Sequence, residues 1–400
     1  MRYITLSLIL IALGCSKPQT FTVNELETPS KAGASLPNLF TDNTGMVFMS
    51  WVETNEDTST LYYSSLVDTI WSDATPIQSS DSWFVNWADF PSIIAQNGKA
   101  MATHWLQKKP GSRYSYDVNI STASKNWETV LTPHNDNTPS EHGFASMVPV
   151  SDSTFMAVWL DGRKTVGQSH GTASDLNTAM TLRSAIISDQ LELLSEHEID
   201  ASVCDCCGTA TILTDDGLIT TYRNRTEDEI RDIYTSKFKN GKWSSPKPVH
   251  NDNWVIAACP VNGPSIASNG KTVAVAWFTA ANDSAKVKVS FSNDYAESFG
   301  PAFQVDDVDA LGRVDIALLG DMTAVVTWVE RSSDDASKAL YKLKQIDQKG
   351  NVLQTQVIAE ISSARTSGFP QLTKIENQLI AAWTQINENG SKQIKTAIIL

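Results

Sequence analysis

The stretch GPSIASNGKTVAVAW, residues 263–277, contains the pattern that decides the fold, because versions of it recur along the whole chain. Each copy has a short apolar segment, a polar turn, and a second apolar run that ends in an aromatic residue. The equivalent first positions are Pro37, Pro91, Ala145, Gly208, Pro264, Val314 and Pro370. Self-similarity at such a period indicates an array of supersecondary units, each packed against the next.

The aromatic residue of each copy confirms the register of the repeat. It lies 13 or 14 residues after the first marker in every copy: Trp51, Trp105, Trp159, Tyr222, Trp277, Trp328 and Trp383. An alternating third strand follows, and usually a turn and a fourth segment. Four short antiparallel strands repeated around an axis describe the blades of a propeller. We therefore predict an all-β, seven-bladed β-propeller of four-stranded blades in one domain, residues 21–400, with six blades as the alternative.

The two ends of the chain predict how the ring closes. The last copy stops at Leu400 after its third strand, and the segment from Phe21 to Thr28 precedes the first copy. We expect this N-terminal segment to supply the missing fourth strand. The recurring aromatic residues are expected to pack in the core between neighbouring sheets, because large rings bury much apolar area.

The first residues have the features of an export signal. Arg2 precedes an apolar stretch from Ile4 to Leu13, which is too short for a permanent membrane-spanning helix. Gly14 and Cys15 follow, and this ending resembles a bacterial lipoprotein signal. The resemblance implies a signal peptide over residues 1–14, a lipid on Cys15, and a tether over residues 15–20. We expect an extracytoplasmic protein of the cell envelope, with the outer membrane favoured and a secreted protein as the alternative.

The charge balance limits the partners. Asp and Glu number 45 against 31 Lys and Arg, so the summed field repels phosphate backbones. We expect no nucleic-acid binding, no membrane contact except through the lipid anchor, and a monomer.

Antiparallel strand order predicts which residues share a face of the ring. The start of each first strand and the end of each second strand meet at the same rim, where the longest insertions also lie. The candidate ligand-binding residues there are Asp89, His142, Asp161, Arg163, Arg223, Arg225, Arg313 and Arg331, with Trp83, Trp87, Phe144 and Trp254 as stacking platforms. Planar guanidinium groups suit a carboxylate. The rim is therefore predicted to bind a glycan or another anionic ligand.

Four cysteines crowd the same rim at two adjacent blades: Cys204, Cys206, Cys207 and Cys259. In an exported protein an even number suggests disulfides, here Cys204 or Cys206 with Cys259. Alternatively, an extended segment would point Cys204 and Cys206 together and Cys207 away, and with Cys259 and His142 they would bind copper or zinc. Free reactive thiols are the third possibility.

The turn SNDYAESF, residues 292–299, resembles the Asp-box hairpin of sialidase-like (BNR) repeat proteins. The resemblance implies a propeller and raises glycoside hydrolysis, for which that family uses an arginine triad, a Tyr nucleophile with a Glu, and an Asp acid/base. Here Ser35 stands where the first triad arginine is needed, and Tyr222 fills the place of a core Trp. The catalytic set is incomplete. The leading hypothesis is therefore a lipid-anchored binding propeller, with a sialidase-like hydrolase and a thiolate metal-binding protein as alternatives.

Overall fold

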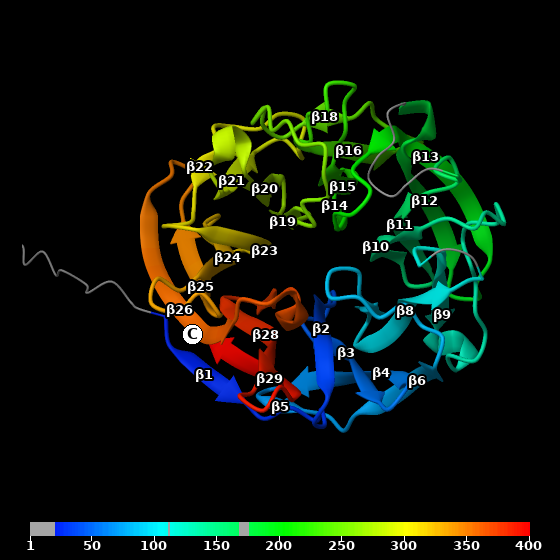
Figure 1. The fold of residues 1–400 in the computed structure, drawn as a ribbon, viewed down its shortest axis with the longest axis horizontal. Coiled ribbons are helices and arrows are strands. Elements are labelled where there is room, and N and C mark those ends of the chain that lie inside the picture. Colours follow the sequence, from blue (N-terminus) through cyan, green and yellow to red (C-terminus); the bar gives the residue numbers. More distant parts are fainter. Residues whose placement is uncertain (1–20, 111–112, 168–175) are drawn as a thin grey trace, which may run out of the picture.

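The computed structural model describes residues 21–110, 113–167 and 176–400, and these form a ring of seven β-sheets around a central axis (Figure 1). The predicted seven-bladed propeller is confirmed, and the six-bladed alternative is excluded. The proposed signal peptide, tether and Cys15 lie outside the described residues. No helix in the described ranges has the length and apolar character needed to cross a membrane.

Each blade starts with a strand next to the axis and continues outward. The innermost strands are β2 (Ala34–Thr41), β7 (Ser92–Gln96), β10 (His142–Ser151), β14 (Ala210–Thr214), β19 (Ser265–Asn269), β23 (Ala310–Leu318) and β27 (Gln371–Ile375). The second strands are β3 (Val47–Asn55), β8 (Lys99–Lys108), β11 (Thr154–Asp161), β15 (Gly217–Arg223), β20 (Thr272–Thr279), β24 (Ala324–Arg331) and β28 (Gln378–Ile386).

The third strands are β4 (Thr58–Val67), β9 (Tyr116–Thr122), β12 (Met180–Ser188), β16 (Ile233–Lys239), β21 (Lys286–Ser292), β25 (Lys338–Ile346) and β29 (Lys392–Ile399). The outer strands are β5 (Ile70–Trp71) with β6 (Thr75–Ser80), β13 (Leu193–Val203), β17 (Lys242–Trp243) with β18 (Lys247–Pro248), β22 (Phe303–Gln304), β26 (Val352–Ser362) and β1 (Val23–Leu26). Four short 3-10 helices complete the described elements: η1 (Ala123–Lys125), η2 (Leu176–Thr178), η3 (Ala281–Asp283) and η4 (Arg365–Ser367).

The prediction of four strands in every blade is too regular. The second blade is a three-stranded sheet, β7-β8-β9, with a single bridge between Ile120 and Leu131 where a fourth strand would lie. In the first and fourth blades the outer strand is broken into two pieces that pair separately with the third strand. The irregularity is confined to the outer edge, where pairing buries the least surface.

The ring closes as predicted through the N-terminal strand. β1 pairs antiparallel with β29, with Val23 opposite Ile399, so the first described strand completes the last blade. The amide of Thr22 also donates to the carbonyl of Leu400 at 3.0 Å. This closure covers the edge of β29, which would otherwise be open to pairing with another chain.

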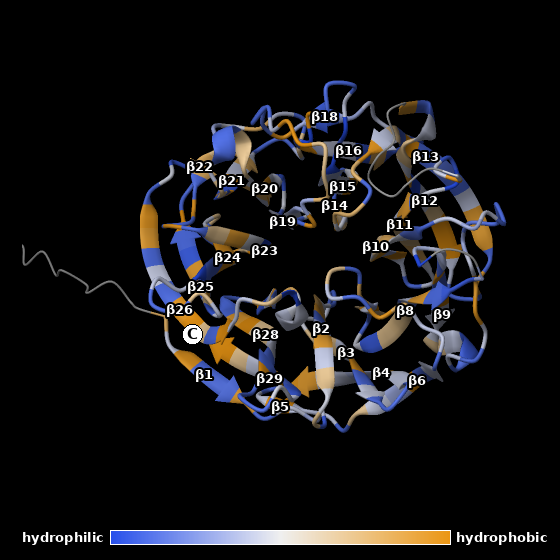
Figure 2. Cartoon of the chain, in the orientation of Figure 1, coloured by the Kyte–Doolittle hydropathy of each residue, from blue (hydrophilic) through white to orange (hydrophobic). Residues whose placement is uncertain are grey.

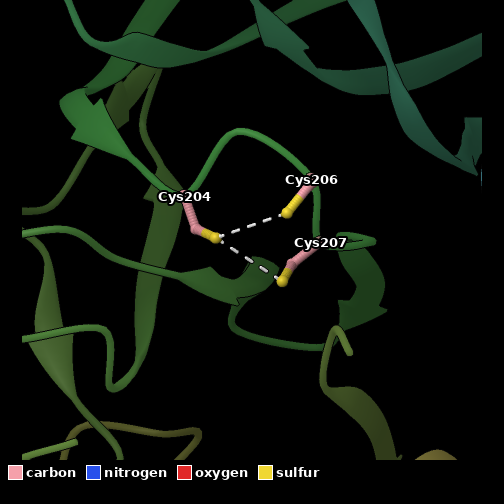
Figure 3. Close-up of side chains that lie close together, drawn as sticks. All are labelled: Cys204, Cys206 and Cys207. Carbon is pink, nitrogen blue, oxygen red and sulfur yellow. Dashed lines mark hydrogen bonds between the residues drawn. The ribbon is translucent and has the colours of Figure 1, made fainter. Parts of the chain in front are cut away.

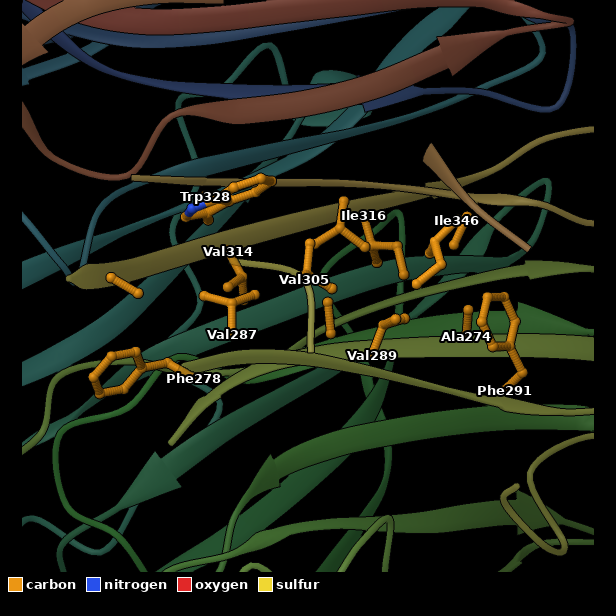
Figure 4. Close-up of a cluster of buried hydrophobic side chains, with 14 of the residues drawn as sticks. Ala274, Phe278, Val287, Val289, Phe291, Val305, Val314, Ile316, Trp328 and Ile346 are labelled. Atoms are coloured by element: carbon orange, nitrogen blue, oxygen red, sulfur yellow. The ribbon is translucent and has the colours of Figure 1, made fainter. Parts of the chain in front are cut away.

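The core lies between neighbouring sheets. The strands carry hydrophobic residues along much of their length (Figure 2), and these meet the hydrophobic residues of the next blade. The second strands are the most apolar, and β20 is buried at all eight positions. Between the fifth and sixth blades, for example, Val287 and Val289 pack with Ile316 and Trp328 (Figure 4). All seven recurring aromatic residues are buried, as expected from the repeat.

Several acidic residues at the rim accept hydrogen bonds from buried indole N–H groups. In three blades the Trp of the second strand donates to the acidic side chain two residues further on, at 2.9 to 3.0 Å. The pairs are Trp51–Glu53, Trp159–Asp161 and Trp328–Glu330. A buried N–H needs an acceptor, so these carboxylates belong to the packing of the blades.

Candidate functional site

A cavity of about 270 Å³ lies at the centre of the ring and is lined by residues from all seven inner strands or the loops before them. Its polar lining includes Asn38, Asp89, Ser92, Ser146, Thr209, Thr211, Ser265, Asp315 and Gln371. Phe90, Phe144 and Phe369 contribute the main aromatic surface. None of the described lining residues has a cationic side chain.

Two predicted residues line this cavity, the stacking platform Phe144 and the acidic residue Asp89. The carboxylate of Asp89 accepts from the amide of Phe144 at 2.8 Å and lies 3.4 Å from the hydroxyl of Tyr116. Burial and, further, the charge of Glu141 raise the pKa of Asp89 well above its usual value. Tyr116 also donates a short hydrogen bond to Glu141. A tyrosine and two carboxyl groups therefore meet beside the cavity.

Asp315 lines the opposite part of the cavity wall and was not predicted. It accepts from Ser265 Oγ at 2.7 Å and from the amide of Leu372 at 2.7 Å. Burial raises the pKa of Asp315 to about 6. In sequence it stands in an ordinary inner strand, and only the ring geometry shows that it faces the axis.

Two of the predicted arginines donate hydrogen bonds to backbone carbonyls of neighbouring segments. Arg223 donates to the carbonyls of Arg231, Asn262 and Phe278 at 2.7 to 3.2 Å. Arg313 donates to Ser367 Oγ and to the carbonyl oxygens of residues 363, 364 and 368 at 2.6 to 3.3 Å. Both are buried, so their donors are used inside the protein.

The other three predicted arginines are paired with carboxylates. Each lies next to an acidic partner: Arg163 with Asp161, Arg225 with Glu229, and Arg331 with Asp309. None of the five arginines is among the residues that line the central cavity. The predicted stacking platforms are also engaged. Trp83 packs on Trp105, Trp87 on Phe369, and the guanidinium of Arg223 lies over Trp254.

Three of the predicted rim residues, His142, Asp161 and Arg163, lie together in a largely buried cluster. It also contains three residues that the sequence did not suggest: Asp117, His134 and Asp136. The rings of His134 and His142 stack at a centroid distance of 3.7 Å with an angle of 4° between planes. His142 Nε2 lies 3.0 Å from Asp136 Oδ2. Arg163 forms a two-point ion pair with Asp161 at 2.7 Å. We call this group the His/Asp cluster.

The three cysteines of one loop come together at the mouth of the fourth blade (Figure 3). Cys204 Sγ lies 3.6 Å from Cys207 Sγ and 4.0 Å from Cys206 Sγ. The prediction that Cys207 points away was wrong, because residues 205–206 form a turn and the segment is not extended. All three are buried, whereas Cys259 is half-buried. None of the four forms a disulfide in the structure.

Hydrogen bonding couples the thiols to one another. The pKa of Cys206 is raised by its hydrogen bonds with Cys204, Cys207 and Cys259, which places Cys259 next to the group. Burial raises the pKa of Cys207 to about 12. Burial also opposes ionisation of Cys204, but hydrogen bonds from the other two thiols and the charge of Arg231 lower its pKa overall. We call Cys204, Cys206, Cys207 and Cys259 the Cys cluster.

Arg231 and Asp205 are further residues of this region, and the sequence did not connect either of them with the cysteines. Arg231 Nη1 lies 3.4 Å from Cys204 Sγ, and its other nitrogens bind Glu229. The pKa of Asp205 is raised to about 6 by burial and by the neighbouring Cys204. The segment YRNRTEDEIRDIY draws attention to its charges, but nothing in its spacing shows that Arg231 turns towards a sulfur.

Two glycines bring the two cysteine-bearing segments into contact. A Cβ on Gly263 would lie 2.2 Å from the carbonyl oxygen of Gly208, so the backbones pass each other at a distance that only glycine permits. Gly208 follows Cys207 directly, and both glycines also line the central cavity. The Cys cluster therefore lies behind the cavity wall.

Comparisons with known proteins support the fold only. The sequence matches no family profile and no curated protein. Among solved structures, a protein of unknown function from Dyadobacter fermentans is similar with a TM-score of 0.50 and 10% identity, covering 96% of this chain and 98% of that one.

Two further similar structures have lower TM-scores. A subtype N10 neuraminidase-like protein of A/little yellow-shouldered bat/Guatemala/060/2010 has a TM-score of 0.44 and 10% identity, covering 96% of this chain and 98% of that one. A thermostable family-43 glycoside hydrolase has a TM-score of 0.40 and 9% identity, covering 92% and 89%. The fold and the side chains define a β-propeller with a polar axial cavity.

Proposed function

We propose that this chain is a binding propeller that takes a small neutral polyol, such as the terminal sugar of a glycan, in its central cavity. The observation that carries the proposal is the described lining of that cavity: hydroxyl, amide and carboxyl groups beside aromatic rings, with no cationic side chain among the lining residues that the structure describes. Such groups provide the donors and acceptors that fix a sugar, while rings cover its apolar face. A volume of about 270 Å³ suits one small ring rather than an extended chain.

The anionic ligand of the original hypothesis has less support. Binding a carboxylate in the cavity would need a guanidinium or ammonium group there, and the candidate arginines are bound to carbonyls and carboxylates elsewhere. Releasing Arg163, for example, would leave the buried carboxylate of Asp161 without its closest cation, which costs several kcal/mol. A neutral ligand avoids this cost.

Glycoside hydrolysis remains the second candidate because of Tyr116, Glu141 and Asp89. These are the residue types that a sialidase-like site uses, and Tyr116 contacts both carboxyl groups. Against this role, Tyr116 is buried, and burial together with the two neighbouring carboxyl groups raises its pKa well above the usual value. A phenol that ionises so reluctantly is a poor nucleophile.

One experiment tests both candidates. Calorimetric titration with a panel of neutral monosaccharides and sialic acid should show binding of a neutral sugar to the full chain and no binding of sialic acid. Nothing lies within 4 Å of a Cβ placed on Gly208, so a large side chain fits there and would fill the cavity. Gly208→Phe should therefore abolish sugar binding, whereas Gly208→Ala should leave sugar binding unchanged. Absence of binding by every sugar would overturn the proposal. Turnover of a fluorogenic glycoside that is lost in Tyr116→Phe would favour the hydrolase.

We also propose that the chain is exported and anchored by a lipid on Cys15, as its first residues suggest. Replacement of Cys15 by Ser should move the protein from the membrane fraction to the soluble fraction of the cell envelope. The measurement is fractionation followed by immunodetection. An unchanged distribution would contradict the lipid anchor.

A further inference from the structure

We propose that the Cys cluster binds one soft metal ion, Cu(I) or Zn(II), through the sulfurs of Cys204, Cys206 and Cys207, with Cys259 as the fourth ligand. The inference starts from the convergence of these thiols at one point. Three come from a single turn after β13, and the fourth comes from the loop before β19. Thiolate sulfur is the ligand that these two ions prefer.

The spacing of the sulfurs is that of a metal site. With metal–sulfur bonds of about 2.3 Å, sulfurs at the corners of a tetrahedron lie about 3.8 Å apart, and those of a flat triangle about 4.0 Å apart. The two measured separations are 3.6 and 4.0 Å, and all three sulfurs lie within 4.8 Å of one another. A disulfide needs about 2.05 Å, so these atoms are placed for shared coordination.

The surroundings can stabilise the charge of a thiolate complex. Three thiolates around Cu(I), or four around Zn(II), leave two negative charges in a dry site, and such charges need nearby partners. Arg231 Nη1 already points at Cys204 Sγ from 3.4 Å, and its charge is permanent. As the ion binds, the thiol protons are released to solvent, and no oxidant is needed.

The backbone holds the two segments in place before an ion arrives. The amide of Cys204 donates to the carbonyl of Arg223, whose guanidinium in turn binds the carbonyl of Asn262 in the Cys259 loop. The contact between Gly208 and Gly263 fixes the separation of the two loops. Cys259, the half-buried member, gives an incoming ion a first ligand that solvent can reach.

The experiment measures ion content and identity. The full chain, purified anaerobically with reductant, is loaded in separate arms with Cu(I) or Zn(II), desalted and measured by elemental analysis. One ion per chain is expected in at least one arm, and competition with bathocuproine for Cu(I) or pyridylazoresorcinol for Zn(II) identifies the preferred ion. Cys204→Ser and Cys207→Ser should each reduce affinity by more than the roughly 10–100-fold that loss of an outer-shell partner costs.

The matched control is Cys15→Ser, the only other cysteine of the chain, which should bind the ion as before. Circular dichroism checks that the serine variants fold. If a variant at one of the buried cysteines does not fold, Cys259→Ser replaces it, because Cys259 is only half-buried. Gly263→Ala should lower ion affinity by forcing the loops apart, because its Cβ would lie 2.2 Å from the carbonyl oxygen of Gly208.

Two results would overturn the proposal. One is the absence of an ion in both arms, or equal ion content in wild type and Cys204→Ser. The other is a titration of the denatured Cys15→Ser chain that finds two reactive thiols instead of four, since that would show a disulfide. Failure of the metal site leaves the proposed function open, because sugar binding is tested separately. The loss of sugar binding in Gly208→Phe is the readout for that function.

Discussion

The Cys cluster and the His/Asp cluster lie at the mouths of neighbouring blades, and both gather buried side chains of the types that bind metals. They differ in how those side chains meet. The three close sulfurs of the Cys cluster point to a common centre (Figure 3). In the His/Asp cluster the two imidazole rings lie parallel and stacked, so their in-plane lone pairs run side by side and do not converge.

Hydrogen bonding strengthens this difference. His134 Nε2 accepts from the amide of Val118 at 3.2 Å, so the proton of the neutral ring is on Nδ1, the atom that faces the carboxylates. Arg163 and Lys109 already neutralise Asp161 and Asp117. The carboxylates of the His/Asp cluster are thus paired with cations of the protein itself, and His142 Nδ1 is a buried ring nitrogen without a hydrogen-bond partner among the described residues. The comparison teaches that proximity of ligand-type residues indicates a metal site only when their free donor atoms converge.

The largest effect expected from this comparison is that of Asp161→Ala. Asp161 is fully buried and accepts from Trp159 Nε1 at 3.0 Å and from two nitrogens of Arg163. Its loss leaves the buried indole N–H without an acceptor and removes the two-point partner of Arg163, which keeps only its longer contacts with Asp136 and Glu196. The free energy of unfolding should fall by about 3 kcal/mol, since an unsatisfied buried donor costs about 1–3 kcal/mol and a charged group more. Urea unfolding monitored by tryptophan fluorescence measures the change.

The control for this substitution is Asp309→Ala, which breaks the exposed ion pair with Arg331 and should cost about 0–1 kcal/mol. Metal content is the second readout, and both variants should retain the ion of the Cys cluster. Loss of the ion in Asp161→Ala, with the fold intact, would show that the His/Asp cluster also binds metal and would break the contrast between the two regions.

The ring could be predicted from the sequence because the same pattern, two apolar segments ending in an aromatic residue, occurs seven times. The aromatic residue at a constant offset is set by core packing, which acts similarly in every blade. The strand Val23–Leu26 is set by the need to cover the open edge of the last blade. The missing outer strand of the second blade was not predictable in this way. Its bridge between Ile120 and Leu131 depends on one loop that has no counterpart in the other copies.

The candidate site was predicted less well, for a physical reason. Antiparallel order correctly brought Cys259 next to Cys206, and His142 next to Asp161. It gives no information on the direction of a long side chain, so the arginines that bind backbone carbonyls were indistinguishable from free ones. The turn that brings Cys207 back to Cys204 was also hidden, because alternation holds only in extended segments.

A smaller effect is expected from acid, and it belongs to the His/Asp cluster. Burial, with the charge of His142 as the next cause, lowers the pKa of His134 to about 3, whereas a histidine in the unfolded chain has a pKa near 6.5. Between these values the unfolded state binds a proton that the folded state does not. The stability contributed by neutral His134 is therefore present above about pH 6.5 and is lost as the pH falls towards 3.

The test replaces His134 by Gln, which does not titrate, and compares urea unfolding of both proteins at pH 7 and pH 5. Wild type should lose about 2 kcal/mol more than the variant over this interval, since one pKa unit corresponds to about 1.4 kcal/mol. The difference between the two proteins removes the contribution of all other groups. Equal losses would mean that His134 takes up a proton in the folded state, and the stacked pair would then be open enough to reach solvent or an ion.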